Sequence, residues 1–128
     1  MSSELEHCLP SDDELAVSQS INESVLQELK GIMGDDFPSL IETYLTSSLE
    51  NIKNIGDAIK EKDAEALMCT AHAFKGSNAN LGLEKLVLFS QSLEIMGRTG
   101  NVSKISEEVY QQMLVEYQKV TIEIKGYL

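Results

Sequence analysis

The sequence contains no tryptophan, only two prolines and only two cysteines, Cys8 and Cys69. Two cysteines are too few for a disulfide framework, so free thiols in a reducing compartment are the expectation. Long apolar runs are also missing: the longest one near the middle, Leu86–Phe89, is far shorter than the about 20 residues that a membrane helix needs. The N-terminus has Glu4 and Glu6 but no basic patch followed by an apolar segment, which is unlike a secretion signal. These absences predict a cytoplasmic protein with no membrane segment.

Basic residues are scarce as well. Ten Lys and Arg residues stand against 21 Asp and Glu residues, which gives a formal net charge of -11. Such a charge opposes broad contact with nucleic acid or with anionic lipid, so the expected partner is another protein. At 128 residues the chain is long enough for one compact core but too short for two ordinary domains, and a catalytic kinase domain does not fit.

The distribution of apolar residues divides the chain into an arm and one helical domain. Residues 1–20 are polar and acidic without a sustained period, so we predict a loose N-terminal arm. Over residues 21–128 the apolar residues recur at the three-and-four spacing of helices with one buried face. The expected helices are a short one between Asn22 and Gly34, a second from about Asp35 and Asp36 to beyond Ile59, a third from Asp63 to about Leu81, a fourth from about Leu83 to Gly97, and a last one carrying Ile105 to Ile124.

The short connections between these helices favour antiparallel neighbours. We therefore predict an all-α fold, an up-down antiparallel four-helix bundle with a short additional N-terminal helix. Ser90 and Gly97 are small residues on the apolar side of the fourth helix, which predicts a close approach of a neighbouring helix there. No strand alternation, internal repeat or low-complexity tract is present in the sequence.

The third helix has two distinct faces. At about 100° per residue, one broad arc should face the core, and His72 lies on the opposite side. The core arc consists of Leu67, Thr70, Phe74, Asn78 and Leu81. The residues within roughly 60° of His72 are Glu65, Met68, Cys69, Lys75, Gly76 and Ala79. His72 is thus predicted to be exposed to solvent in the middle of a rigid helix.

Gly76 is unusual because glycine inside a helix costs about 1 kcal/mol relative to alanine. A functional reason for this glycine is that another protein approaches the imidazole closely, and a side chain at Gly76 would obstruct it. Ordinary helix variation or close packing within the bundle could also account for it. We favour the explanation that Gly76 gives a partner access to the imidazole, because the helical period places Gly76 on the outward face.

His72 and Lys75 provide a nucleophile and a cation one helical turn apart. A neutral imidazole is nucleophilic, and an ordinary pKa of about 6.5 leaves a usable neutral fraction at cytoplasmic pH. A phosphoryl group on the ring would bring negative charge that a nearby cation can stabilise. Taken alone, an exposed histidine or lysine on a helix is more often a solvated residue without a role, so only the combination of the two with Gly76 indicates a function.

That combination resembles a known signature. The run AHAFKGSNANLG at residues 71–82 is similar to the motif of the histidine-containing phosphotransfer (HPt) family, and His72 falls where that family carries its phosphohistidine. The resemblance covers about residues 22 to 126 and is strongest over 63 to 98. Phe74 departs from the aliphatic residue common at its position, which concerns packing. Further similar runs are Gly34–Phe37, Asn80–Leu83 and Leu93–Glu94.

The resemblance implies a free-standing phosphorelay protein. His72 would accept a phosphoryl group, through the ring nitrogen farther from the backbone, from an aspartyl phosphate on a receiver domain. It would then pass the group to the aspartate of another receiver. Lys75 would orient or stabilise the phosphoryl group, and Gly76 would leave room for the partner. The partners would be the receiver domains of a hybrid sensor histidine kinase and of a response regulator, and the Mg²⁺ ion needed would lie in the receiver, so no cofactor or metal is expected in this chain.

Further predictions concern the residues around this site. Met68, Cys69 and Ala79 are expected to form the rim of a small docking patch. Arg98 could contact the partner, but Glu94 precedes it by four residues, the favourable order for a local ion pair, and the pair is the favoured interpretation. The neighbouring Ser77 and Asn78 are expected mainly to support helix packing and the turn.

Three alternatives from other classes remain open to test. A zinc site from His7, Cys8, Cys69 and His72 is arithmetically possible, but the spacing lacks paired ligands separated by short spacers. An enzyme that uses ATP is disfavoured because no glycine-rich phosphate loop or kinase signature occurs. A non-catalytic helical adaptor would have the same fold and would bind a signalling protein without phosphorylation. A monomer is expected, since one bundle can bury all the apolar stripes.

Overall fold

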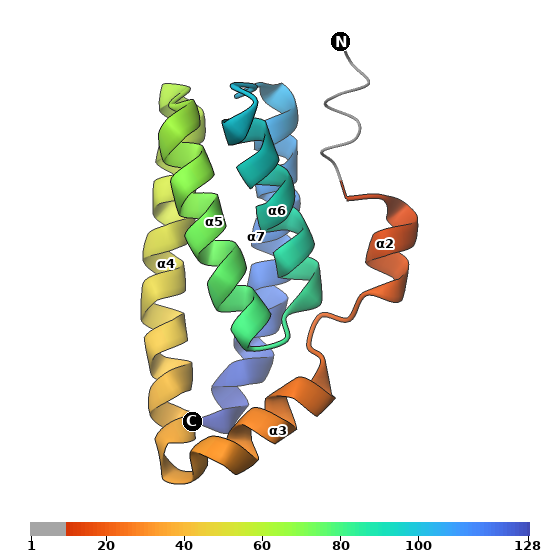
Figure 1. Cartoon of the computed structure of the whole chain (residues 1–128), viewed down its shortest axis with the longest axis vertical. Coiled ribbons are helices and arrows are strands. Elements are labelled where there is room, and N and C mark those ends of the chain that lie inside the picture. The colour runs from red at the N-terminus through yellow and green to blue at the C-terminus, as the bar shows by residue number, and fades with distance from the viewer. Residues whose placement is uncertain (1–9) are drawn as a thin grey trace.

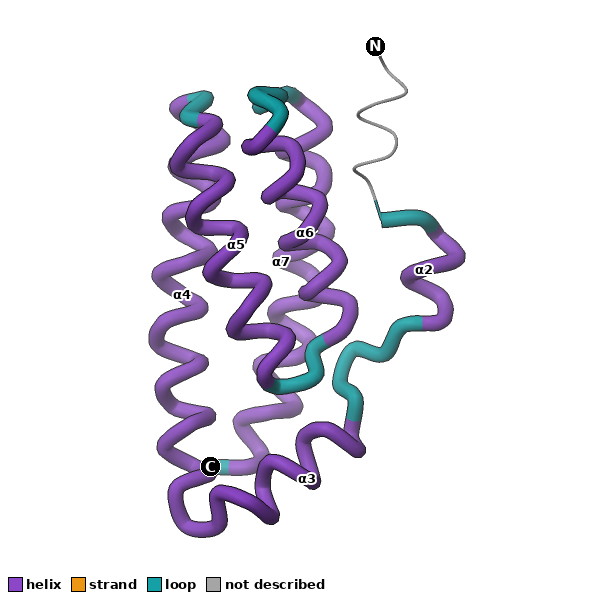
Figure 2. Tube along the Cα trace, in the orientation of Figure 1, coloured by secondary structure: helices purple, strands orange, loops and turns teal. Residues whose placement is uncertain are grey.

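The computed structural model describes residues 10–128, and within this range it is all-α, without a strand (Figure 2). Helices α4 (Phe37–Glu61), α5 (Ala64–Asn80), α6 (Glu84–Arg98) and α7 (Lys104–Ile124) run up and down alternately, and α3 (Glu23–Met33) crosses the lower end of the bundle (Figure 1). The predicted four-helix bundle with a short additional helix before it is therefore confirmed.

The helix ends follow the local signals of the sequence. The side chain of Asn22 accepts a hydrogen bond from the backbone N–H of Val25 at the start of α3, and that of Asp63 accepts one from Ala66 at the start of α5. Gly82 follows α5 with φ at 72°, in the left-handed region that favours glycine. The helix ends that set the position and length of α5 are thus encoded in short stretches of sequence.

The second predicted helix begins slightly later than expected. A short 3-10 turn, η1 (Gly34–Asp36), precedes α4, and a second one, η2 (Lys125–Tyr127), follows α7. Gly34 itself has φ at 55°, as expected of the residue that ends α3. The ring of Tyr127 packs edge-on against Phe37 at a centroid distance of 5.7 Å, so the end of the described chain closes the bottom of the bundle.

The core contains buried hydrogen bonds between helices as well as apolar side chains, and two of them involve α4. The Tyr44 hydroxyl donates to Oδ1 of Asn78 at 2.6 Å, and the hydroxyls of Ser48 and Tyr117 lie 2.6 Å apart. Both pairs connect α4 to another helix of the bundle, and they satisfy polar groups that would otherwise be costly to bury. The buried side chains around them include Ile41, Ile52, Ile55, Leu67, Phe74, Leu86, Leu93, Met113 and Val120.

The buried face of α5 differs from the prediction at one position. Leu67, Phe74, Asn78 and Leu81 are buried as expected, but Thr70 is only half-buried, while the neighbouring Ala71 is completely buried. At about 100° per residue, Ala71 lies about 40° from Leu67 around the helix axis, and Thr70 lies about 60° from Leu67 in the opposite direction. The centre of the buried face therefore lies nearer to Ala71 than to Thr70. Because the small Ala71 side chain contributes little to an apolar pattern, the pattern predicted a buried face that included Thr70 and not Ala71.

The described part of the predicted loose arm contains helical structure. Ser11 and Glu14 form a capping box at the start of a short helix, α2 (Asp12–Val17). The backbone N–H of Gln19 donates to Oε1 of Glu84 at 2.9 Å, and the side chain of Asn22 donates to Oε2 of the same carboxylate at 2.9 Å. These bonds attach the segment to the start of α6. Residues 1–9 lie outside the described range.

Helices α5 and α6 approach each other closely at Gly97, as the sequence indicated. A Cβ atom placed on Gly97 would lie 2.5 Å from the backbone nitrogen of Met68 and 2.7 Å from the carbonyl oxygen of Ala64. Both atoms belong to the backbone of α5, so they cannot turn aside as a flexible side chain would. Gly97 therefore sets the separation between the two helices that build the site described next.

Candidate functional site

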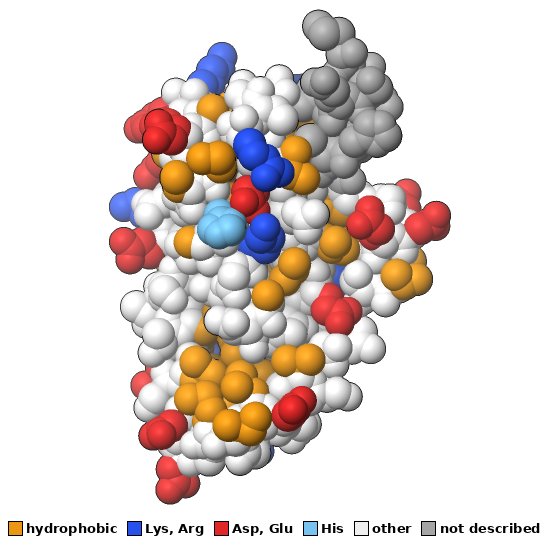
Figure 3. Space-filling view, in the orientation of Figure 1, with side chains coloured by type: hydrophobic (Ala, Val, Ile, Leu, Met, Phe, Trp, Pro, Cys, Tyr) orange, Lys and Arg blue, Asp and Glu red, His pale blue; other side chains and the backbone are white. Residues whose placement is uncertain are grey.

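His72 lies in the middle of α5 with its side chain 69% exposed. In Figure 3 it is the pale blue side chain on the front face, among acidic and basic side chains. The core-facing positions of α5 are held by Ala71 and Phe74, which leaves the imidazole on the outer side of a helix packed against both α4 and α6. The predicted exposure of His72 is confirmed.

The inner nitrogen of the imidazole has a buried partner. Nδ1 of His72 lies 2.8 Å from Oε2 of Glu94 on α6, and Glu94 is only 8% exposed. An ionised carboxylate only accepts hydrogen bonds, so Nδ1 carries the proton in this contact. In the neutral ring, Nε2 is then left with a free lone pair. The result is a histidine fixed in the tautomer that makes its outer nitrogen nucleophilic.

Lys75 binds the other oxygen of the same carboxylate. Its Nζ lies 2.6 Å from Oε1 of Glu94, and its side chain is 30% exposed. Burial alone would raise the pKa of Glu94, but the hydrogen bonds from Lys75 and His72 and the positive charge of Lys75 outweigh burial and hold this pKa below its ordinary value. Glu94 is therefore an ionised carboxylate between two cationic or potentially cationic groups.

Gly76 is exposed beside His72, and a Cβ atom added to it would meet nothing within 4 Å. Close packing within the bundle, one of the alternatives for this glycine, is therefore excluded. The contrast with Gly97 is direct, because there the absent side chain makes room for another helix. At Gly76 the absent side chain leaves the surface next to the imidazole low and open.

The predicted docking residues occupy the same side of the bundle to different extents. On α5, Cys69 and Ala79 are exposed and Met68 is half-buried. Ala79 also lines a shallow groove between the start of α3 and the α5–α6 turn, together with Val25 and Val87. The structure therefore places all three around or along the face that carries the imidazole.

The predicted ion pair between Glu94 and Arg98 is wrong. Glu94 points toward α5 and binds His72 and Lys75, whereas Arg98 is exposed at the end of α6. The reason is tertiary: a carboxylate with two partners on a packed neighbouring helix gains more than it would from an exposed pair on its own helix. Arg98 stays a candidate for contact with a partner.

Glu94 is the site residue that the sequence prediction missed. A signal was available, because Ser90, Glu94 and Gly97 are spaced i, i+4 and i+7 and so share one face of α6. The small Ser90 and Gly97 predicted a close helix approach on that face. An acidic residue between them is therefore expected to face the neighbouring helix. Its position opposite the lone histidine could then have been inferred.

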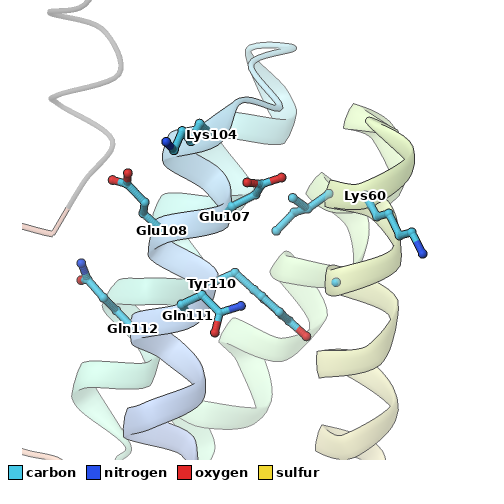
Figure 4. A pocket seen from close by; sticks show the side chains of 9 residues that line it. Lys60, Lys104, Glu107, Glu108, Tyr110, Gln111 and Gln112 are labelled. Carbon is cyan, nitrogen blue, oxygen red and sulfur yellow. The ribbon is translucent and has the colours of Figure 1, made fainter.

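Two further features of residues 10–128 bear on other kinds of site. No group of three or more potential metal-ligating side chains occurs in this range, but His7 and Cys8 of the zinc alternative lie outside it. A groove between α4 and α7, seen in Figure 4, is lined by side chains of both charges, with Tyr110 pointing from α7 toward α4. The hydroxyl of Tyr110 donates to the carbonyl of Ile52 at 3.1 Å. His72 is not among the residues that line this groove.

The helices of the described part of the chain include none that is both long enough and apolar enough to cross a membrane. The fold and the site together define a helical protein that presents a surface imidazole, backed by a buried carboxylate, on a rigid helix. Comparison with known proteins assigns this class to a family.

The family model of the Hpt domain matches residues 39–120, which include His72, Lys75 and Glu94. The crystal structure of histidine-containing phosphotransfer protein B (HptB) from Pseudomonas aeruginosa PAO1 is similar, with a TM-score of 0.80 and 31% sequence identity over 84% of this chain and 93% of that chain. No curated protein matches significantly. The chain belongs to the Hpt family, and it is a histidine phosphotransfer protein of a phosphorelay, a phosphoryl carrier rather than a kinase.

Proposed function

We propose that His72 is the phosphoacceptor and that its Nε2 atom receives the phosphoryl group. The observation that carries this proposal is the hydrogen bond between Nδ1 and the buried Glu94, because it leaves Nε2 as the exposed, unprotonated nitrogen. Among the described residues His72 is also the one histidine, and it lies within the segment that the family model matches.

The donor in this proposal is an aspartyl phosphate on a receiver domain. The lone pair of Nε2 attacks phosphorus, the bond between phosphorus and the aspartyl oxygen breaks, and its electron pair leaves on the aspartate carboxylate. No proton moves, because Nδ1 keeps its hydrogen and the ring becomes cationic. In the onward step a second receiver aspartate attacks phosphorus, and the P–N bond returns its electron pair to Nε2.

Several further assignments belong to the same proposal. The receivers are those of a hybrid sensor histidine kinase and of a response regulator, and each supplies the Mg²⁺ ion for its own exchange. The carrier contributes no ATP-binding site, acts in the cytoplasm and works as a monomer. Its acidic surface, with a net charge of -11, discourages docking except around Lys75 and the neighbouring apolar residues. The exposed Cys69 and Ala79, the half-buried Met68 and the exposed Arg98 form the contact rim.

The test is incubation of the native protein with a receiver domain phosphorylated on its aspartate with labelled phosphate. The native chain should take up an acid-labile label, and His72→Gln should take up none. Glu107→Gln, an exposed change in the first turn of α7 and not on the helix that carries His72, is the control and should behave as native. Uptake of label by His72→Gln at the native rate would overturn the assignment of His72.

A second experiment tests the open surface at Gly76. The space around its added Cβ is empty, so Gly76→Leu should fold normally. The new side chain stands beside the imidazole and should weaken receiver binding at least about tenfold, in the range of interface substitutions that cost about 1–2 kcal/mol. Native affinity of a folded Gly76→Leu protein, measured by titration calorimetry, would contradict the docking face.

The adaptor alternative predicts that His72→Gln keeps the full signalling output of the native protein.

A further inference from the structure

We infer that the segment before α3, with the short helix α2, selects among receiver domains, because it forms one wall of a groove that accepts an apolar side chain of the receiver. The groove lies between the start of α3 and the α5–α6 turn and has a volume of about 370 Å³. This role rests on the proposed function, in which a receiver covers the face that carries His72. It concerns residues that the Hpt family model, which begins at residue 39, does not include.

The groove is continuous with the face that carries the imidazole. Ala79 lines the groove from α5 and lies seven residues after His72, which is about 10 Å along the helix axis and about 20° around it. Val87 lines the groove from α6 and lies seven residues before Glu94, at the same displacement. Because α5 and α6 run in opposite directions, both displacements point toward the α5–α6 turn (Figure 1). The groove therefore lies directly below the imidazole on the same helical hairpin.

Backbone hydrogen bonds hold the N-terminal segment at the edge of this groove. Ser18, at the end of α2, is one of the lining residues. The backbone N–H of Lys85 donates to the carbonyl of Gln19 at 3.3 Å, and the backbone N–H of Asn22 donates to the carbonyl of Gly82 at 2.8 Å. The wall that this segment adds is thus fixed to the helical hairpin that carries His72.

A receiver that docks on His72 would also cover the groove. A standard interface covers about 800 Å² on each partner, which corresponds to a disc about 16 Å in radius. The groove begins about 10 Å from His72 along α5, inside such a disc. An apolar receiver side chain placed there would bury Val25, Val87 and Leu88, which line the groove and are half-buried in the free chain. A polar side chain at the same place would lose its water without a partner, so the groove discriminates between receivers.

The charge of α2 favours a basic residue beside that apolar side chain. The first turn of α2 carries Asp12, Asp13 and Glu14, all exposed, and its last residue, Val17, is 83% exposed. Leu15 packs against the core and holds this helix to the bundle. In Figure 3 acidic side chains of α2 lie on the same front face as the imidazole, to its right. The fitting receiver surface therefore presents an apolar side chain flanked by Lys or Arg.

Transfer from a phosphorylated receiver domain, measured over a range of receiver concentrations, separates docking from chemistry. Val87→Gln makes the groove polar and should raise the receiver concentration for half-maximal transfer about fivefold. The maximal rate should stay native, because the groove lies about 10 Å from the imidazole. Val87→Ile keeps the groove apolar and should transfer as native. The matched control is Val115→Gln, since Val115 is 70% exposed on α7 and does not line the groove.

Circular dichroism should show that these variants fold. A native half-maximal concentration for Val87→Gln would overturn the inference, and so would an equal increase for Val115→Gln. Failure of the native chain to take up label would refute the proposed function. Native uptake with the same concentration dependence in every variant would refute only the role of the groove.

The charge of α2 is tested by Asp12→Asn together with Asp13→Asn. This pair should raise the half-maximal concentration about threefold at low salt, and the difference should vanish at about 1 M salt, where the Debye length is about 3 Å. Asp35→Asn together with Asp36→Asn removes the same charge from exposed positions at the other end of α3 and should transfer as native. An equal change in the two pairs would reflect net charge alone and would overturn the role of α2.

Discussion

Gly97 offers a sharp test of the helix packing, because Gly76 provides a matched control in the neighbouring helix. Both are helical glycines replaced by alanine, and in an unhindered helix this replacement stabilises by up to about 1 kcal/mol. At Gly76 the added methyl group meets nothing within 4 Å, so Gly76→Ala should gain that stability.

At Gly97 the same methyl group would stand 2.5 Å and 2.7 Å from backbone atoms of α5. Neither atom can move without the whole helix, so α5 and α6 must separate by a few tenths of an ångström or more. Overpacking of this kind costs about 1–3 kcal/mol. We expect an overpacking cost near the upper end of this range, and the gain in helix propensity offsets about 1 kcal/mol of it. Gly97→Ala should therefore lose about 2 kcal/mol of unfolding free energy.

Urea unfolding at neutral pH measures both changes, and thermal unfolding provides a second reading. The two variants should differ by about 3 kcal/mol, or about 10 °C in melting temperature for a domain of this size. Gly97→Ala should also lengthen the contact of 2.8 Å between His72 and Glu94, because Glu94 moves with α6. Equal stabilisation by the two alanines would refute the packing argument.

Three further predictions concern other contacts. Tyr44→Phe leaves Oδ1 of the buried Asn78 without its hydroxyl donor and should cost about 1–3 kcal/mol in urea unfolding; native stability would contradict the role of this bond. The pKa of Glu94 is lowered, so its ionised form stabilises the fold above the ordinary value of 4.5, and this contribution is lost as the pH falls through the lowered pKa. Glu94→Gln should therefore lose less stability than native as the pH falls from about 5 through the lowered pKa, and an unchanged acid profile would argue against the pairing. Glu84→Ala removes the acceptor of the Gln19 amide, which should exchange its hydrogen faster while global stability falls by less than about 1 kcal/mol; continued protection would place the anchor of α2 elsewhere.

The sequence was sufficient for the features that depend on local chemistry. The caps at Asn22 and Asp63, the helix stop at Gly82 and the outward face of His72 follow from neighbouring residues and the helical period, and the structure has all of them. The small Gly97 predicted close packing because its face was already assigned to the core.

The features that the prediction missed depend mainly on which residues of two packed helices meet. The rotation of α6 against α5 determines that Glu94 contacts His72 and Lys75. The rule that opposite charges four residues apart in one helix form ion pairs favoured Arg98 instead. The short helix α2 was missed for a different reason. Its capping box, Ser11 with Glu14, was visible in the sequence, but six helical residues with little apolar content show no sustained period.

The connection between α5 and α6 has a consequence for the order in which the molecule assembles. The contact between His72 and Glu94 spans 22 residues of sequence, whereas that between Glu23 and Tyr127 spans 104. Closing a short loop loses less chain entropy, and contacts of low sequence separation form faster. The hairpin of α5 and α6 should therefore complete the site early in folding and retain it when the far end of the bundle opens.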